Sequence, residues 1–483
     1  MSMLETLTFA QCLAKLMQKH QLSLSSLATM IGSRADLRHI LADDGTANKR
    51  AMLYEKLKKS QLFDDDDYQQ LTRSLEISRL GVERYRFQQA ISDILSGRPA
   101  EAAQEMLIDS GRPLAQRLSI LENAENIEII CFNSCFHSLF NTLAVFFEDK
   151  NKDLILRHYV HSTANWNTAA EYVAVVRPVL FDERYQPYLS GDSPDSNVPC
   201  LSGNLLFLRA VIQNEPTEML FALADQQTAY EVPNASASHL FAFVSKVLKN
   251  AKPQPVPIKE DSPYKVDFPS LCMTFLSHEL NRSTYSITND LCFQQTPTSI
   301  AMNAFRDKGI SSDEETARII NRTLSIHEQR YQNQYRKKKP TYHIMTLVGC
   351  KRFLATGMST DHFVGFRPFT PQERRIIFEN MVEAARDNTN FIPLILKDAD
   401  FDHRYNLVCY DKLGVSIDAK DTDYDISKGY RSVFLMFPEF TRQYMEYYLE
   451  ILVGEKCYSR QKSIEMLEEI YLDFLAEHNW NDN

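Results

Sequence analysis

The chain has 483 residues, of which 44% are hydrophobic and 24% are charged, and its net charge is −10. This length is too great for one ordinary hydrophobic core, so we expect a globular protein of two to four domains. The net negative charge argues against a chain that coats nucleic acid along its whole length.

The sequence favours a cytoplasmic protein. Its N-terminus lacks the basic start and apolar core of a signal peptide, and no apolar run reaches the ~18 residues that would indicate a membrane span. The nine cysteines are scattered and most lie in apolar runs, which predicts reduced, buried thiols. Cys131 and Cys135 have no matching pair elsewhere, so we predict no zinc site, and we expect no cofactor.

Charge is distributed unevenly. Residues 1–62 contain nine Lys and Arg against five Asp and Glu, a net charge of +4, which leaves −14 for the rest of the chain. The boundary is a run of four aspartates, 64–67, which fits the N-terminus of a helix because the unpaired backbone N–H groups there favour negative charge. A small basic head on an acidic body is typical of a DNA-binding regulator, although chance could produce the same imbalance.

The first 125 residues are predicted to be helical. Apolar spacing indicates short helices throughout 1–95, which we predict to be a helix-turn-helix head. The segment Ser96-Gly97-Arg98-Pro99 ends the last of these helices, and 96–125 is expected to be a helical connector.

A change of period at residue 127 predicts a first α/β unit over 126–250. Residues 127–133 and 154–161 read as strands, and helices are expected after each of them, which favours parallel strands. A turn-rich break follows at 188–203, and then two more strands and a covering helix. Proline and charge enrichment predicts a linker at 251–263.

The remaining chain is expected to contain a helical segment over 264–340 and a second α/β unit over 341–483. Strands are predicted at 342–348, 391–398, 405–411, 413–418 and 432–437. The fold class is therefore multidomain: an all-α head and an α/β body of two α/β units joined by a helical segment. The two α/β units could be a remote duplication, which spacing alone does not show.

The N-terminal pattern resembles the Xre/Cro family of helix-turn-helix regulators. A first helix carries Phe9 and Leu13, a second contains Ala28, which allows close helix packing, and Gly32 permits the turn before a third, basic helix. The chain departs from the family pattern because Leu37 falls five residues after Gly32 rather than six. A second candidate at 71–87 has Glu76 where the turn glycine is usual, and a plain helical bundle is the better interpretation there.

The resemblance implies that the third helix enters the major groove of double-stranded DNA, with Arg34 and Arg38 reading guanine or phosphate. The full set of expected DNA contacts is Ser33, Arg34, Asp36, Arg38, His39, Lys49 and Arg50. Such regulators usually pair, so we expect self-association as a dimer, and the body could sense a small-molecule or protein effector.

Motifs for chemistry are mostly missing. Neither a Walker A nor a dinucleotide-binding glycine motif is present, and no nucleophile elbow is found. His278-Glu279 and His327-Glu328 lack the second histidine of a zinc-protease helix. The aspartate runs at 398–403 and 421–427 have calcium-loop spacing, but they lack its closing glutamate, and solvated turns are the better interpretation. We therefore predict no catalytic or metal residues.

The sequence thus predicts a sequence-specific DNA-binding transcriptional regulator that is not an enzyme. Two alternatives remain open. One is an enzyme with an unrecognised α/β active site at the strand ends, where the candidate groups are His158, His362, Asp398 and His403. The other is a scaffold whose helical head binds protein rather than DNA.

Overall fold

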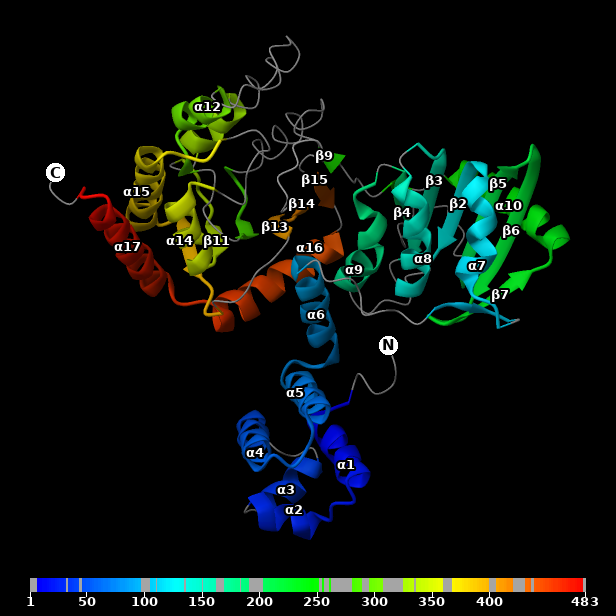
Figure 1. Cartoon of the computed structure of the whole chain (residues 1–483), viewed down its shortest axis with the longest axis horizontal. Helices are drawn as coiled ribbons and strands as arrows, with labels where there is room; N and C mark the ends of the chain where they lie inside the picture. The colour runs from blue at the N-terminus through cyan, green and yellow to red at the C-terminus, as the bar shows by residue number, and fades with distance from the viewer. Residues whose placement is uncertain are drawn as a thin grey trace. The chain divides into compact units, whose positions relative to one another are not determined.

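The computed structural model shows two compact units, Met1–Ala90 and Ile91–Asn483 (Figure 1). The structure describes residues 7–31, 34–42, 46–96, 105–109, 111–133, 136–149, 151–161, 169–182, 184–190, 203–251, 254–255, 260–261, 280–288, 295–306, 325–333, 336–358, 367–398, 405–419, 431–435 and 438–480. Each unit is described by itself.

The first unit is helical, as its apolar spacing predicts. Its helices are α1 (Phe9–Lys19), α2 (Leu24–Ile31), α3 (Arg34–Leu41), α4 (Ala47–Ser60), α5 (Asp65–Leu80) and the first part of α6 (Val82–Ser96). Phe9, Leu13, Leu27 and Leu37 are fully buried in one core. The aspartate run does start a helix, because the Asp64 side chain accepts a hydrogen bond from the backbone N–H of Asp67 at the beginning of α5.

The first α/β part contains an eight-stranded sheet with the order β1-β7-β6-β5-β2-β3-β4-β8. Its main strands are β2 (Glu125–Phe132), β3 (Leu154–His161), β4 (Tyr185–Ser190), β5 (Asn204–Ile212), β6 (Glu215–Leu223) and β7 (Thr228–Val232). The edges are β1 (Leu107–Ile108) and β8 (Gln254–Pro255). The central strand β2 is parallel to β3 and antiparallel to β5.

Helices cover both faces of this first sheet. α8 (His137–Glu148) and α9 (Ala169–Leu180) connect β2, β3 and β4 and lie over one face. α10 (Asn234–Ala251) packs on the opposite face against Ile130, Tyr159 and Phe207. Two short helices, α7 (Leu114–Leu118) and η2 (Ser119–Asn123), precede β2.

The second sheet has seven strands in the order β12-β11-β10-β13-β14-β15-β9. The strands are β9 (Glu260–Asp261), β10 (Thr284–Ile287), β11 (Thr341–Met345), β12 (Phe391–Ile395), β13 (Tyr405–Tyr410), β14 (Gly414–Ala419) and β15 (Arg431–Leu435). Here β10 is central, parallel to β11 and antiparallel to β13.

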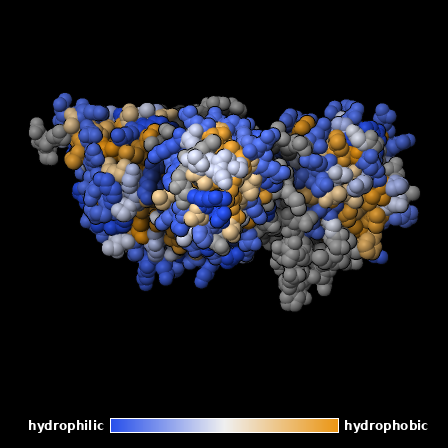
Figure 2. Space-filling model, turned by 90° about the horizontal axis from the view of Figure 1, so that it is seen from below, coloured by the Kyte–Doolittle hydropathy of each residue, from blue (hydrophilic) through white to orange (hydrophobic). Residues whose placement is uncertain are grey.

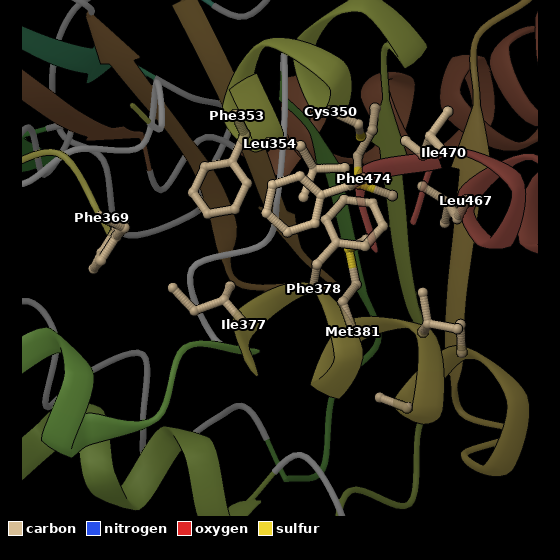
Figure 3. Packing of buried hydrophobic residues seen from close by; sticks show 14 of the residues in the cluster. Cys350, Phe353, Leu354, Phe369, Ile377, Phe378, Met381, Leu467, Ile470 and Phe474 are labelled. Atoms are coloured by element: carbon tan, nitrogen blue, oxygen red, sulfur yellow. The ribbon is translucent and has the colours of Figure 1, made fainter. Parts of the chain in front are cut away.

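One face of the second sheet carries a large apolar core. The helices that build it are α12 (Thr298–Arg306), α14 (Leu347–Thr356), α15 (Pro371–Asp387) and α17 (Arg460–Glu477). Phe353, Phe378 and Phe474 come from three of these helices and lie together in Figure 3. The opposite face is covered by α16 (Pro438–Tyr447) and by the π-helix η4 (Tyr448–Lys456), where Tyr448 packs on Tyr285.

The two sheets share one topology. In each, a central strand has two successive parallel strands on one side and an antiparallel meander on the other. The backbone hydrogen bonds repeat as well. In the first sheet, Leu156 N donates to Arg184 O at 2.9 Å. At the equivalent position of the second sheet, Thr341 N donates to Asn390 O at 2.7 Å. The structure thus contains the internal repeat that sequence spacing could not show.

The structure corrects the prediction in four respects. The proposed linker 251–263 contains β8 and β9, which extend the edges of different sheets. The proposed helical segment 264–340 contains β10, the central strand of the second sheet. The proposed break 188–203 begins inside β4. Both sheets are mixed rather than parallel, because the meander strands run against the central strand.

Within the described residues, no helix is both long and apolar enough to cross a membrane. Figure 2 shows one face of the molecule, on which hydrophilic residues predominate and hydrophobic residues form separate patches.

Candidate functional site

Two buried histidines occupy equivalent positions in the two sheets. His158 lies on β3 beside Cys131 of the central strand and Pro187 of β4. His343 lies on β11 beside Ser286 of the central strand and Pro393 of β12. In both sheets, the strand register therefore places the histidine between a proline and a residue with a nucleophilic side chain, which is Cys131 in the first sheet and Ser286 in the second.

The residues that end the central strands extend this correspondence. Asn133 N donates to Tyr159 O at 2.9 Å, and Thr288 N donates to Ile344 O at 3.0 Å. Thr288 follows Ser286 by two positions, and its Oγ1 lies 3.1 Å from Nε2 of His343, which puts it on the face of the histidine. Asn133 follows Cys131 by the same two positions. Both residues lie at the carboxyl end of their central strand, and α/β folds commonly bind ligands at this end of a strand.

In the second sheet the histidine lies between two hydroxyl groups. Ser286 Oγ is 2.6 Å from Nδ1 of His343, and Thr288 Oγ1 is 3.1 Å from Nε2. Ser286 Oγ also lies 3.2 Å from the carbonyl oxygen of Tyr342, to which it can donate. We call Ser286, His343 and Thr288 the serine–histidine site.

The serine–histidine site can move a proton. When the imidazole proton is on Nε2, it is donated to Thr288 Oγ1, and Nδ1 is free to accept the hydroxyl proton of Ser286. A hydroxyl nucleophile within hydrogen-bond reach of a base, with a third group orienting the base, is the arrangement of nucleophilic catalysis. His343 is 1% exposed and Ser286 is 6% exposed, so bulk water is largely kept from the pair.

The first sheet holds its histidine differently. Nδ1 of His158 is 3.0 Å from the Tyr185 hydroxyl, which in turn is 2.7 Å from the Tyr172 hydroxyl. The ring of Phe140 lies 5.1 Å from the imidazole, and His158 is fully buried. Hydrogen-bonded tyrosines and aromatic packing are what a core histidine requires, so this repeat has the character of a structural site.

Of the four groups predicted for an enzyme, the structure describes His158 and Asp398, and it places them at different sheets. His158 is the core histidine of the first sheet, and Asp398 is exposed after β12. His362 and His403 lie outside the described residues, as does the aspartate run 421–427. His343 and Ser286 were missed because they are 57 residues apart and match no local motif. In the sequence they are polar residues in two short strands that each contain a second polar residue, Thr284 in β10 and Thr341 in β11.

Most of the residues expected to contact DNA are exposed on the head. Arg34, Arg38 and His39 project from α3, while Ser33 lies outside the described residues. Asp36 and Lys49 pair with each other, with Nζ 3.4 Å from Oδ1, and Arg50 is half-buried. Part of the expected set is thus engaged within the head.

Among the described residues, no three His, Cys, Asp or Glu side chains lie close enough together to hold a metal ion. The described cysteines Cys12, Cys131, Cys350, Cys409 and Cys457 are buried, as predicted.

No protein-family model matches the chain, and no curated protein matches it either. Among solved structures, the chain is similar to phosphatidylserine synthase of Haemophilus influenzae Rd KW20 at 11% sequence identity. The match covers 82% of this chain and 97% of that chain, with a TM-score of 0.23. A similarity this low transfers neither the fold nor the activity of the synthase.

The prediction of a DNA-binding transcriptional regulator has no support from the comparisons: no family model or curated protein matches the chain, and the similar solved structure is a phosphatidylserine synthase. Within the head, Asp36 and Lys49 form an exposed ion pair, so these two of the seven expected DNA contacts are engaged with each other.

Proposed function

We propose that the chain is an enzyme that uses Ser286 as nucleophile and His343 as its general base. The observation that carries this proposal is the 2.6 Å contact between Ser286 Oγ and His343 Nδ1 at the carboxyl end of the central strand. The equivalent histidine of the first sheet supports it by contrast, because the same scaffold position there holds tyrosine contacts instead.

The reaction class that suits such a pair is acyl transfer. Ser286 Oγ attacks the carbonyl carbon of an ester or amide while its proton passes to His343 Nδ1. The imidazolium then gives this proton to the departing alcohol or amine, which leaves an acyl group on Ser286. Water or another acceptor attacks the acyl group while His343 takes its proton, and the imidazolium then returns this proton to Ser286 Oγ as the bond to the acyl group breaks. Thr288 holds the imidazole in the required tautomer through Nε2.

Burial of the pair shapes how the reaction proceeds. A substrate reaches Ser286 only when the structure around it opens locally, so opening precedes chemistry. Once the substrate has entered, exclusion of water strengthens the electrostatic contribution of His343 to proton transfer.

A fluorophosphonate reagent tests the proposal because it forms a covalent adduct with activated serines. We expect an adduct on Ser286 in the wild-type protein and no adduct at this position in Ser286→Ala. His343→Gln is expected to slow labelling by about 100-fold, the usual contribution of a general base.

His158→Gln is the matched control, since it changes a histidine at the equivalent position in the other repeat. It is expected to leave the labelling rate unchanged. Labelling of Ser286 that does not depend on His343, or no labelling at all in the folded wild-type protein, would overturn the proposal.

A further inference from the structure

The serine–histidine site has a buried tyrosine directly behind it. Tyr448 is fully buried and lies on the face of the sheet opposite to the side chains of Ser286 and His343. Its ring makes an edge contact with Tyr285 at 5.4 Å and with Tyr342 at 6.4 Å. These two tyrosines are the sequence neighbours of Ser286 and His343, and alternation along a strand puts them on the Tyr448 side.

The hydroxyl group of Tyr448 reaches the backbone of the proposed nucleophile. It donates a hydrogen bond to the carbonyl oxygen of Ser286 at 2.7 Å. Burial raises the pKa of Tyr448 well above its usual value, so the phenol keeps its proton and remains a donor over the working pH range. The bond spans 162 residues of sequence and ties the central strand to the C-terminal helical layer.

Tyr448 stands where helical geometry changes. It is the first residue of η4, in which the helix widens to π geometry over Tyr448–Lys456. Such segments are rare, and they are frequently found at functional sites because they shift the register of the side chains. The far end of η4 is fixed to β12, since Lys397 N donates to Lys456 O and Tyr458 N donates to Ile395 O, each at 2.9 Å.

We infer that Tyr448 is a positioning residue for Ser286, holding the serine backbone so that Oγ stays within reach of His343 Nδ1. This inference rests on the proposed function. Tyr448 does not face the reacting atoms, so it acts only through the peptide group of Ser286. The π-helical start of η4 places the phenol at the required distance from the strand.

The chain offers a matched control in Tyr444, which belongs to α16. It is fully buried in the same aromatic cluster, 5.9 Å from the ring of Tyr448. Among the described residues, its hydroxyl group has no hydrogen-bond partner. Tyr444→Phe and Tyr448→Phe therefore each remove a buried phenol oxygen, but only Tyr448→Phe removes a hydrogen bond to Ser286.

The experiment measures the rate of fluorophosphonate labelling at Ser286 and the ¹⁵N chemical shifts of the His343 imidazole across pH. Tyr448→Phe is expected to slow labelling about 10-fold, the effect of losing one hydrogen bond worth roughly 1.4 kcal/mol, and to shift the Nδ1 resonance. Tyr444→Phe is expected to change neither quantity.

Two outcomes would overturn the inference while leaving the proposed function intact. One is wild-type labelling and an unchanged Nδ1 resonance in Tyr448→Phe. The other is equal slowing in Tyr444→Phe, which would show a general packing effect. Failure of the proposed function is a separate result, because the wild-type protein itself would then give no adduct on Ser286, and the inference would fall with it.

Discussion

His158 and His343 occupy the same position in two sheets of the same topology, yet Nδ1 of one contacts a phenol and Nδ1 of the other contacts the hydroxyl of a serine. One scaffold therefore presents an imidazole in two chemical settings. The first is closed by Tyr185 and Phe140, and the second is placed beside a nucleophile. This difference separates a structural histidine from a proposed catalytic one.

The structural role of His158 gives a first prediction. Tyr185→Phe removes a hydroxyl that bridges His158 and Tyr172, leaving two buried polar groups without this partner. We expect the opening free energy of β3 and β4, measured by amide hydrogen exchange, to fall by about 1–3 kcal/mol. Tyr230→Phe, at a residue that is 49% exposed, should change it by less than about 0.5 kcal/mol. Equal protection in both variants would refute a structural role for the network.

His137 at the start of α8 predicts a pH dependence. Burial, together with repulsion from Arg177, lowers the pKa of His137 from 6.5 to about 4. Between these values the unfolded chain binds the proton and the folded chain does not, so folding weakens as pH falls. The shift corresponds to about 3 kcal/mol lost between pH 7 and pH 4.

The measurement for His137 is the pH dependence of hydrogen exchange protection in α8, with His137→Gln as the variant. The variant should lose most of the dependence in this window. The same slope in wild type and variant would show that His137 is not the titrating group.

In the head, Asp67 links two helices. Its buried carboxylate accepts hydrogen bonds from Lys19 at 2.8 Å and is 2.6 Å from Nε2 of His20. Burial raises the pKa of Asp67, but the two hydrogen bonds outweigh this and the pKa lies below 3.8. The stabilisation is present above pH 3.8 and is lost as pH falls through the lower, folded-state pKa.

Asp67→Asn should therefore lower the free energy of opening of the α1–α5 pair by about 2 kcal/mol at pH 7. Asp66→Asn is the control, because Asp66 is exposed in the same first turn of α5 and changes the charge at the helix end equally. Hydrogen exchange in α1 and α5 distinguishes the two, and similar losses would assign the effect to the helix end alone.

Gly357 predicts a steric effect that can be separated from backbone strain. It has a φ of +74° at the end of α14, and an added Cβ would lie 2.1 Å from the Phe369 carbonyl oxygen. Gly111 has a φ of +76°, with open space around its Cβ position. Gly357→Ala should destabilise its surroundings by more than about 1 kcal/mol beyond the effect of Gly111→Ala, as judged by hydrogen exchange. A similar loss of stability in both variants would show that backbone strain, rather than the contact with Phe369, causes the effect.

Much of the fold could be predicted from local sequence. Longer strands such as β3 and β5 carry apolar runs that mark them, and Asp64 and Thr370 mark helix starts through side-chain caps. The central strand β10 was missed because it has only four residues and two of them, Thr284 and Ser286, are polar. Its identity depends on strands far away in the sequence.

The candidate site could not be predicted for the same reason. Ser286 and His343 are joined by strand pairing across 57 residues, and neither has a sequence neighbour that indicates chemistry. The head gave the opposite error, because a local pattern around Gly32 indicated a function that the comparisons do not support. Local sequence patterns indicate where helices and strands lie, whereas the residues of a site are brought together by the register between strands that are distant in the sequence.

The most direct test of the account is to locate the fluorophosphonate adduct by tandem mass spectrometry. Trypsin should release the fragment 283–306, which contains Ser283, Ser286 and Ser299. We predict that the added mass lies on Ser286 in the wild-type protein and in His158→Gln, and that it forms about 100-fold more slowly in His343→Gln. An adduct on another serine, or equal rates in the two histidine variants, would contradict a serine–histidine enzyme.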